Sequence, residues 1–466
     1  MAEAFQKVFR SVRRSTVRTI CGCAVVVGSL EVTTNLPSQG RSSTVYHRLA
    51  DDWIVPAMRR FLGPEEAHKM ALKIAILAPT YKPSAKEQRM NVEVRLWKGK
   101  GDKLTKVFPN PIGLAAGYDK DGTAISPLMA MGFGFVEVGS VCLQAQPGNP
   151  SPRMFRLVED EAIINRYGFN SMGADAVEEH LKEYRNNQLS LLTGGEESWE
   201  QKVYNFLWPG AADGKISGLV GINLGKNKTS NTPLEDYQKL ILQLGPYADY
   251  LVINVSCPNI SGLRDLQSTT SLEGLLKGCQ EACEQLANTK EGTPPPPLLV
   301  KLSPDLSDSE LENIAAVLMK LGIDGIILTN TTTSRPTSLA SLNKVENGGL
   351  SGKPLKDRST ECIRVLYRFT KGTIPIIGVG GVQNGRDAYE KFRAGASLVQ
   401  VYSGMIYEGP GMVSKVRDEL ADQMEQNGQR DLQTEVIGVD HDDLVFRRKR
   451  CDQERAMMTM RTGASA

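Results

Sequence analysis

The residues best suited to chemistry in this sequence are amides, lysines, small polar residues, glycines and one thiol, and each follows a short apolar run. They are Lys120, Ser140, Asn223, Asn254, Cys257, Asn259, Lys301, Asn330, Gly380, Gly381, Tyr402 and Ser403. Asparagine offers both donors and acceptors, which suits a planar small molecule with amide groups. Carboxylate pairs for glycoside hydrolysis are missing from these positions, and no His/Asp/Glu cluster there predicts a metal. The chain has 4 histidines, which leaves general-base work to another residue type.

Glycines near the end of the sequence suit the recognition of a phosphate. Gly380 and Gly381 close the seventh apolar run, Ser403 and Gly404 close the eighth, and Gly352 lies on the loop between the sixth and the seventh. Loops of this kind expose backbone N–H groups to a phosphate, so a phosphate-bearing cofactor is the natural ligand. Glycine-rich turns also occur for purely steric reasons, and the residues alone are compatible with both interpretations.

Eight apolar runs, each followed by a helical stretch, must position these residues. The runs are Ile112–Ala116, Phe135–Ser140, Leu219–Gly225, Tyr250–Cys257, Leu298–Pro304, Gly325–Asn330, Pro375–Val382 and Leu398–Gly404. Eight strand–helix units predict an α/β fold, the (β/α)8 TIM barrel, whose working residues lie where the strands end. A doubly wound open sheet is the alternative. It is expected to carry G-x-G-x-x-G after its first strand, and the residues Gly117 to Lys120 do not fit that pattern.

The composition is that of a soluble globular enzyme. Of 466 residues, 41% are hydrophobic and 23% are charged, and the net charge is +2. This balance gives no support to nucleic-acid binding, which normally requires a basic patch. The 8 cysteines are too sparse for a disulfide scaffold, so we expect reduced thiols.

The N-terminal residues 1–30 differ from the rest. Residues 1–18 carry five basic residues against the single acid Glu3, which predicts a mitochondrial presequence; a disordered basic tail is the alternative. The apolar run Ile20–Leu30 is well short of the ~20 residues that span a bilayer, so we expect at most a short anchor.

Residues 45–80 contain two amphipathic stretches separated by Gly63 and Pro64. Their apolar faces are Trp53, Ile54, Ala57, Met58, Phe61 and Leu62, and then Met70, Ala71, Ile74, Ala75 and Leu77. This spacing predicts two short helices. The helices either cap the main domain or form a surface that enters a membrane and admits a lipid-soluble partner.

A series of ordered motifs resembles the dihydroorotate dehydrogenase family over roughly residues 49–420. The motifs are IGLAAGYDKDG (112–122), GFGFVEVGSV (132–141), GNPSPRMFRL (148–157), INRYGFNSMG (164–173), GINLGKNKTS (221–230), NVSCPNISGLR (254–264), TNTTTSRP (329–336), GGLSGKPL (348–355), IIGVGGV (376–382) and LVQVYSG (398–404). The leading helices and the presequence resemble the class 2, quinone-linked form of the mitochondrial inner membrane. The resemblance implies an FMN-containing barrel at residues 90–420 that oxidises dihydroorotate to orotate in pyrimidine biosynthesis, with ubiquinone as electron acceptor.

The resemblance also implies roles for single residues. FMN would be held by Ala115, Ala116, Ser140, Asn223, Lys301, Thr329, Gly352, Gly381, Tyr402 and Ser403. The substrate would be surrounded by Lys120, Asn165, Phe169, Asn254, Asn259, Asn330 and Thr331. Cys257 takes the position of the catalytic base, and His68 and Arg156 match positions of the quinone tunnel. The residue types agree, because a lysine can neutralise the orotate carboxylate and asparagines can match the pyrimidine amides.

The loop around Cys257 departs from the class 2 pattern. Class 2 members usually have serine at this position, and class 1 members have cysteine; the usual threonine three residues later is Ile260 here. A thiol, with an ordinary pKa of about 8.5, needs less activation than a hydroxyl at neutral pH. We therefore hypothesise less dependence on a hydroxyl and water relay. The altered loop also makes fumarate an acceptor to test beside quinone.

Two segments carry no assigned chemistry, and two other functions stay open. Residues 185–217 read as a partly ordered surface insertion, and the polar residues 421–466 as a solvated tail. Lys301 at the end of the fifth run also suits a Schiff-base lyase or aldolase. The third possibility is an FMN-binding, membrane-associated protein without turnover. We predict neither a protein partner nor a metal.

Overall fold

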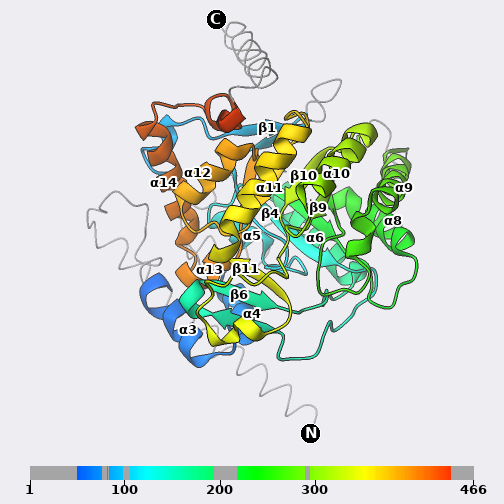
Figure 1. Ribbon diagram of the computed structural model, residues 1–466, viewed down its shortest axis with the longest axis horizontal. Coiled ribbons are helices and arrows are strands. Elements are labelled where there is room, and N and C mark those ends of the chain that lie inside the picture. Colours follow the sequence, from blue (N-terminus) through cyan, green and yellow to red (C-terminus); the bar gives the residue numbers. More distant parts are fainter. Residues whose placement is uncertain are drawn as a thin grey trace, which may run out of the picture.

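The computed structural model describes residues 50–75, 81, 83–97, 105–193, 218–288 and 294–441. The predicted presequence and apolar run, residues 194–217 of the predicted insertion, and residues 442–466 lie outside the described residues. Figure 1 shows a barrel with helices packed around it.

Eight parallel strands form a closed barrel, which confirms the predicted (β/α)8 fold. They are β3 (Ile112–Leu114), β4 (Phe135–Val141), β7 (Leu219–Leu224), β8 (Tyr250–Asn254), β9 (Leu298–Leu302), β10 (Gly325–Leu328), β12 (Ile376–Val379) and β13 (Leu398–Val401). The circle closes where β13 pairs with β3, with Val399 opposite Ile112. Strands covered on both faces are apolar throughout, which explains the continuous runs. All strands except β4 end earlier than predicted, because the small and polar residues that close each run belong to the loops.

Helices follow the strands and cover the outside of the barrel. They are α5 (Ile125–Ala130), α6 (Ala174–Thr193), α8 (Pro233–Leu244), α9 (Thr269–Asn288), α10 (Asp308–Leu321), α11 (Lys356–Phe369), α12 (Gly385–Ala394), α13 (Ser403–Glu408) and α14 (Met412–Gln426). Local signals set their ends: Ser307 caps α10 by accepting the N–H of Glu310 at 3.3 Å, and Gly322 ends it with a left-handed φ of 65°. Short helical turns are η1 (Ala50–Ile54), η3 (Glu87–Arg89), η5 (Val158–Asp160), η6 (Gly245–Tyr247), η7 (Arg264–Gln267), η8 (Leu342–Val345), η9 (Lys353–Leu355), η10 (Leu432–Val436) and η11 (Val439–His441).

Two small antiparallel sheets lie outside the barrel. Strands β1 (Val94–Leu96) and β2 (Lys106–Phe108) pair beside the amino ends of the barrel strands, where the ring of Phe108 lies 5.3 Å from that of Phe135. The other sheet has the order β11-β6-β5 and joins Met154–Leu157 (β5) and Ala162–Asn165 (β6) with Gly349–Gly352 (β11). It therefore connects the excursion after β4 with the excursion after β10.

The two predicted leading helices are present as α3 (Val55–Phe61) and α4 (Pro64–Ile74), and the chain turns between them at Gly63. Large apolar side chains of this segment remain in solvent: Trp53, in the preceding turn η1, is 73% exposed, and Phe61, on α3, is 76% exposed. In the part of the chain that the structure describes, no helix combines the length and the apolar character that crossing a bilayer requires.

The prediction of a solvated tail from residue 421 onward is wrong for residues 421–441. Ala421 and Met424 on α14 are buried, and so are Val436 and His441 beyond it. The backbone carbonyl of Ala394 lies 3.1 Å from Nε2 of His441. A few apolar side chains at irregular spacing anchor this segment, although its composition is polar.

Candidate active site

A cavity at the carboxyl ends of the barrel strands collects the predicted substrate and cofactor residues. Its lining includes Ala115, Ala116, Lys120, Ser140, Asn165, Phe169, Asn254, Cys257, Asn259, Lys301, Thr329, Asn330, Thr331, Gly352, Gly381, Tyr402 and Ser403. The remaining predicted residue, Asn223 on β7, is fully buried and does not line the cavity. It lies directly behind the lining, since its Oδ1 accepts hydrogen bonds from Ser140 and from Asn254.

A buried carboxylate that sequence reasoning missed lies below this cavity. Glu137, in the middle of β4, has no exposed surface. It accepts hydrogen bonds from Asn223 Nδ2 at 2.8 Å and from Gln400 Nε2 at 2.6 Å. Lys301 Nζ lies 3.9 Å from it. The sequence does contain a signal for this residue, because Glu137 is the one charged residue in the apolar run FVEVGSV.

Lys301 connects this buried carboxylate to the cavity. Burial lowers the pKa of Lys301, and the nearby charge of Glu137 opposes the shift. The amine of Lys301 therefore lies in the cavity wall, and its carboxylate partner Glu137 lies on the barrel side. From this position the amine can face negative charge that develops on a ligand in the cavity.

One side of the cavity suits a flat, phosphate-bearing group. Gly381 has a φ of +72°, and a Cβ there would lie 2.6 Å from the backbone of Lys356, so glycine alone lets the backbone line the cavity. The hydroxyl of Thr329 is buried and has no hydrogen-bond partner among the described residues. An unpaired buried hydroxyl in a cavity wall is suited to a polar atom of a ligand.

The opposite side presents amides and an ammonium. Asn330 Nδ2 donates to Ser256 Oγ at 3.0 Å, and Asn259 Nδ2 donates to the backbone carbonyl of Asn165 at 3.1 Å. The ammonium of Lys120 lies 3.5 Å from the centre of the Tyr167 ring. Burial, and then the charge of Arg153, lowers the pKa of Lys120 to about 7. This side can therefore pair an anionic group with a lysine and match the edges of an amide-containing ring.

Cys257 lies in a small apolar cluster at the edge of the cavity. Its neighbours in this cluster are Cys142, Phe169, Ile260 and Leu263. Burial raises the pKa of the Cys257 thiol, while a backbone hydrogen bond from Asn259 and the positive charges of Arg264, Lys120 and Lys301 oppose the shift. Burial of the thiol thus disfavours the thiolate, whereas the nearby cations favour it.

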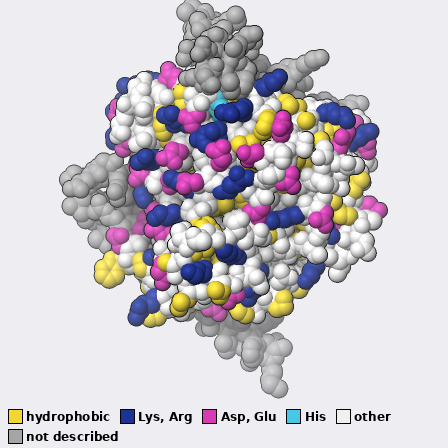
Figure 2. Space-filling model, in the orientation of Figure 1, with side chains coloured by type: hydrophobic (Ala, Val, Ile, Leu, Met, Phe, Trp, Pro, Cys, Tyr) yellow, Lys and Arg dark blue, Asp and Glu magenta, His cyan; other side chains and the backbone are white. Residues whose placement is uncertain are grey.

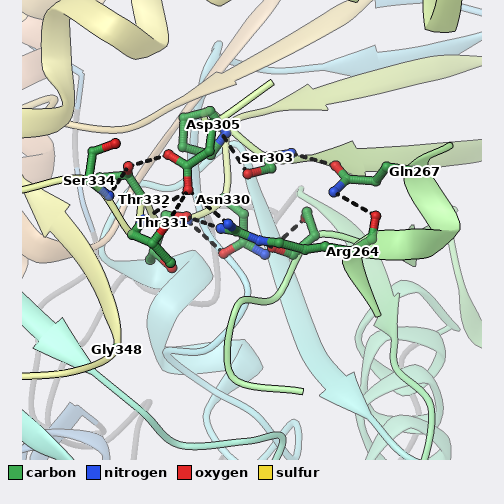
Figure 3. Close-up of polar contacts among 12 residues, drawn as sticks. Arg264, Gln267, Ser303, Asp305, Asn330, Thr331, Thr332, Ser334 and Gly348 are labelled. Carbon is green, nitrogen blue, oxygen red and sulfur yellow. Dashed lines mark hydrogen bonds and ion pairs between the residues drawn. The ribbon is translucent and has the colours of Figure 1, made fainter. Parts of the chain in front are cut away.

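A polar network ties the Cys257 loop to the loop after β10, as Figure 3 shows. Arg264 donates to Asp305 Oδ2 at 2.8 Å, to the carbonyl of Thr331 at 3.1 Å and to the carbonyl of Ser256 at 3.3 Å. Asp305 also accepts from the backbone N–H of Thr333 at 2.9 Å. One arginine and one carboxylate therefore fix two loops that both line the cavity.

The two predicted tunnel residues line a second, apolar cavity between α3, α4 and the barrel. His68 Nε2 lies 2.7 Å from the carbonyl oxygen of Tyr118, and burial lowers its pKa to about 4, so the ring is neutral. Arg156 donates to the carbonyls of Arg59 at 2.8 Å and Leu62 at 3.1 Å. Its Nε and Nη2 have no partner among the described residues, which suits a polar ligand atom in this cavity.

Tyrosine rings connect the two cavities. The ring of Tyr402, which lines the first cavity, lies 5.6 Å from that of Tyr118, which lines the second. The ring of His68 is stacked 6.3 Å from that of Tyr402. The polar site and the apolar pocket thus share a thin aromatic wall.

This fold and site define a (β/α)8-barrel enzyme whose cavity suits a flat phosphate-bearing cofactor and a small planar amide. A family model described as dihydroorotate dehydrogenase matches residues 102–424. The chain belongs to the dihydroorotate dehydrogenase family.

Similar proteins agree with this assignment over most of the chain. The mitochondrial dihydroorotate dehydrogenase (quinone) of Mus musculus is 46% identical, with 84% of this chain and 90% of that protein covered. The dihydroorotate dehydrogenase (quinone) of Azorhizobium caulinodans is 42% identical, with 83% and 99% covered. The crystal structure of DHODH from Eimeria tenella in complex with ferulenol has a TM-score of 0.72 and 38% identity, with 84% of this chain and 99% of that chain covered.

We expect Asp305→Ala to lower the free energy of unfolding by about 2–3 kcal/mol, because it leaves Arg264 Nη1 and the Thr333 N–H without their acceptor. Burial raises the pKa of Asp305, but its hydrogen bonds outweigh burial and hold the pKa below its usual value. The contribution is therefore present above the unfolded pKa and is lost as pH falls through the folded pKa. Denaturant unfolding at pH 7 and pH 3 measures it.

The matched control is Asp308→Ala, whose carboxylate is 64% exposed and 3.7 Å from Arg358. A loss below about 1 kcal/mol is expected there. Equal losses in the two variants at pH 7 would contradict the role of Asp305.

Proposed function

We propose that this enzyme oxidises (S)-dihydroorotate to orotate, with FMN as hydride acceptor and a quinone as final electron acceptor, the fourth step of pyrimidine biosynthesis. The observation that carries the proposal is the convergence of Lys120, the asparagines and Cys257 on one side of a cavity. That cavity shares an aromatic wall with an apolar pocket. A polar substrate can thus bind on one side of the cofactor site, and a lipid-soluble acceptor can bind on the other.

FMN would be held by the residues that line the glycine-rich side of the cavity. Gly352, Gly381 and Ser403 would receive its phosphate, and Ser140, Lys301 and Thr329 would face its ring system. The bare backbone at Gly381 and the unpaired hydroxyl of Thr329 support this fit. When bound, FMN supplies a flavin ring that accepts a hydride.

The protein residues bind and orient the substrate. Lys120, when protonated, pairs with the carboxylate of dihydroorotate, and Asn254, Asn259 and Asn330 hydrogen-bond to its amide groups. Lys301, which pairs with Glu137 on the barrel side, would place its positive charge beside the ring system of bound FMN. The same carboxylate opposes the uncharged amine that a Schiff-base lyase would need at Lys301.

Cys257 removes the proton from the substrate carbon adjacent to the one that loses the hydride. Its neighbours Ile260, Leu263 and Phe169 are apolar, so the side chain three residues beyond the thiol offers no hydroxyl for a proton relay. The nearby charges of Arg264, Lys120 and Lys301 favour the thiolate and offset part of the burial that raises the pKa of the thiol. This environment supports direct proton abstraction by sulfur.

The quinone would enter the apolar cavity between α3 and α4. The unpaired Arg156 donors and the neutral His68 ring can hydrogen-bond to quinone oxygens there. Figure 2 shows hydrophobic side chains at the lower left edge of the molecule, where Figure 1 places α3. Trp53 and Ile54 in η1, Phe61 on α3 and Met70 on α4 are exposed, which supports contact with the mitochondrial inner membrane.

The purified protein is expected to be yellow, because bound FMN absorbs visible light, and anaerobic dihydroorotate is expected to bleach it. Absorption spectra before and after addition of the substrate measure this. A bleached spectrum supports the proposal. A flavin that is present but not bleached would identify an FMN-binding protein without turnover, and a colourless protein trapped by borohydride with a carbonyl substrate would identify a Schiff-base enzyme.

Cys257→Ala is expected to slow flavin reduction by about 10²- to 10⁴-fold, the usual contribution of a general base. Cys257→Ser is also expected to be slow at neutral pH, because no hydroxyl at position 260 relays its proton. Since burial raises the thiol pKa, the wild-type rate should rise as pH increases through that pKa, and the rise should vanish in Cys257→Ala. Anaerobic stopped-flow absorbance across pH 6–10 measures all three proteins.

Cys279→Ala on α9 is the control, since that buried thiol lies outside both cavities. It should reduce flavin at the wild-type rate. Unchanged reduction in Cys257→Ala would remove Cys257 from the mechanism.

Arg156→Met is expected to raise KM for a short-chain quinone at least 10-fold, because it deletes the free donors in the apolar cavity, and to leave flavin reduction by dihydroorotate unchanged. Separate measurement of the reductive and oxidative half-reactions tests this. Arg60→Met, an exposed arginine of α3 outside the cavity, is the control. Good reoxidation of the wild type by fumarate but not by quinone would overturn the class 2 proposal.

A further inference from the structure

An ion pair joins the helix α4 to the loop that precedes β5. Arg153 Nη2 donates to Glu65 Oε1 at 2.7 Å and Arg153 Nε donates to Glu65 Oε2 at 3.1 Å, so the pair is bidentate. The two side chains are only 12% and 20% exposed. The charge-assisted bonds to Arg153 hold the pKa of Glu65 down to about 2. Such geometry distinguishes this pair from an ordinary surface ion pair.

Arg153 also shapes the wall of the substrate cavity. Its Nη1 donates to the carbonyls of Pro147 at 2.6 Å and Asn149 at 2.9 Å. The backbone N–H of Asn149 in turn donates to the carbonyl of Tyr167 at 2.8 Å. Hydrogen bonds therefore lead from Glu65 to Arg153, from Arg153 to Asn149 and from Asn149 to the cavity residue Tyr167.

Tyr167 brings this chain of contacts to the substrate lysine. The guanidinium carbon of Arg153 lies 5.0 Å and the ammonium of Lys120 lies 3.5 Å from the centre of the same ring. Both distances allow a cation–π interaction. The aromatic ring thus has two cations as neighbours, and among the described residues Arg153, but not Lys120, has a carboxylate partner at bonding distance.

We propose that Glu65 is a positioning residue for the substrate carboxylate, which acts through Arg153 and Tyr167 to fix the position and the charge of Lys120. The inference rests on the proposed function, because it takes Lys120 as the partner of the dihydroorotate carboxylate. Helix α4 lines the apolar cavity with His68. The inference assigns to the same helix a role in the polar cavity, through Glu65. The helix thereby links the two substrate sites mechanically and electrostatically.

The electrostatic part of this role has a definite sign. The charged and titratable groups around Lys120 are Arg153, Asp121, Glu65, Cys257, His68, Cys142 and Tyr167. Arg153 lowers the pKa of Lys120, whereas Glu65 and Asp121 raise it. An anionic ligand needs the protonated amine, so its affinity falls as pH rises through this pKa. Loss of Glu65 should move that fall to lower pH, and loss of Arg153 should move it to higher pH.

The experiment measures the dissociation constant of orotate by calorimetry on the flavin-loaded enzyme from pH 6 to 9.5. In Glu65→Gln the pH at which affinity falls should shift down by about half a unit to one unit, and affinity at pH 8 should drop about 3- to 10-fold. In Arg153→Gln the fall should shift up by a similar amount. Loosening of the loop alone would weaken binding equally at every pH and would not shift the two variants in opposite directions.

The matched control is Glu66→Gln, the same chemical change one residue along α4. The carboxylate of Glu66 is exposed and accepts the N–H of Gly63 at 3.3 Å, so this variant reports any effect of a weakened helix end. It should bind orotate as the wild type does. If Glu65→Gln fails to fold, Glu65→Asp keeps the charge, and its pH profile should match the wild type.

The outcomes separate the inference from the proposed function. A Glu65→Gln profile identical to that of Glu66→Gln, or parallel shifts in Glu65→Gln and Arg153→Gln, would overturn the inference while leaving dihydroorotate oxidation intact. A shifted profile in Glu65→Asp would also overturn it. Wild-type enzyme that neither binds orotate nor is bleached by dihydroorotate would instead overturn the proposed function.

Discussion

A carboxylate without access to water lies at the centre of the barrel, and the arrangement of the site depends on how its charge is satisfied. Burial of an unpaired charge costs several kcal/mol or more, so Glu137 requires several donors around it. Asn223, Gln400, Tyr250 and Lys301 meet that need from four other strands. Asn223 then contacts Asn254, and Asn254 contacts Asn330, so one connected network leads from the barrel interior to the substrate side. The orientation of the cavity amides is thus tied to the core.

The sequence predicts the barrel well because its strands are buried on both faces. All eight apolar runs contain a strand, and seven of them, all except the run that contains β7, contribute residues to the cavity lining. The parts that could not be read are those that depend on contacts between distant residues. Glu65 and Arg153 are 88 positions apart, and neither has neighbours that indicate a bidentate pair. The roles of Cys257 and His68 came from resemblance to a family, because a single cysteine or histidine has no distinctive spacing.

The substitution at position 257 is consistent with its surroundings. A hydroxyl base needs a partner that carries its proton away, and Ile260 and Leu263 provide none. A thiol can hold the charge itself when cations are near, and Arg264 contributes one while it also joins two substrate loops. The apolar cluster around Cys257 and the cations near it are therefore consistent with each other. The chain lacks a hydroxyl at position 260, and its base at position 257 is a thiol, which is more acidic than a hydroxyl.

The sheet β11-β6-β5 places a constraint on how this enzyme can change over time. Gly349 pairs with Asn165 and Gly352 pairs with Ala162, although the two strands come from different strand–helix units. A slip of one residue would turn every side chain of one strand to the other face. An insertion or deletion inside β6 or β11 would therefore disturb the paired strand of the other excursion as well. Changes of length are compatible with this sheet only in the loops outside the paired residues.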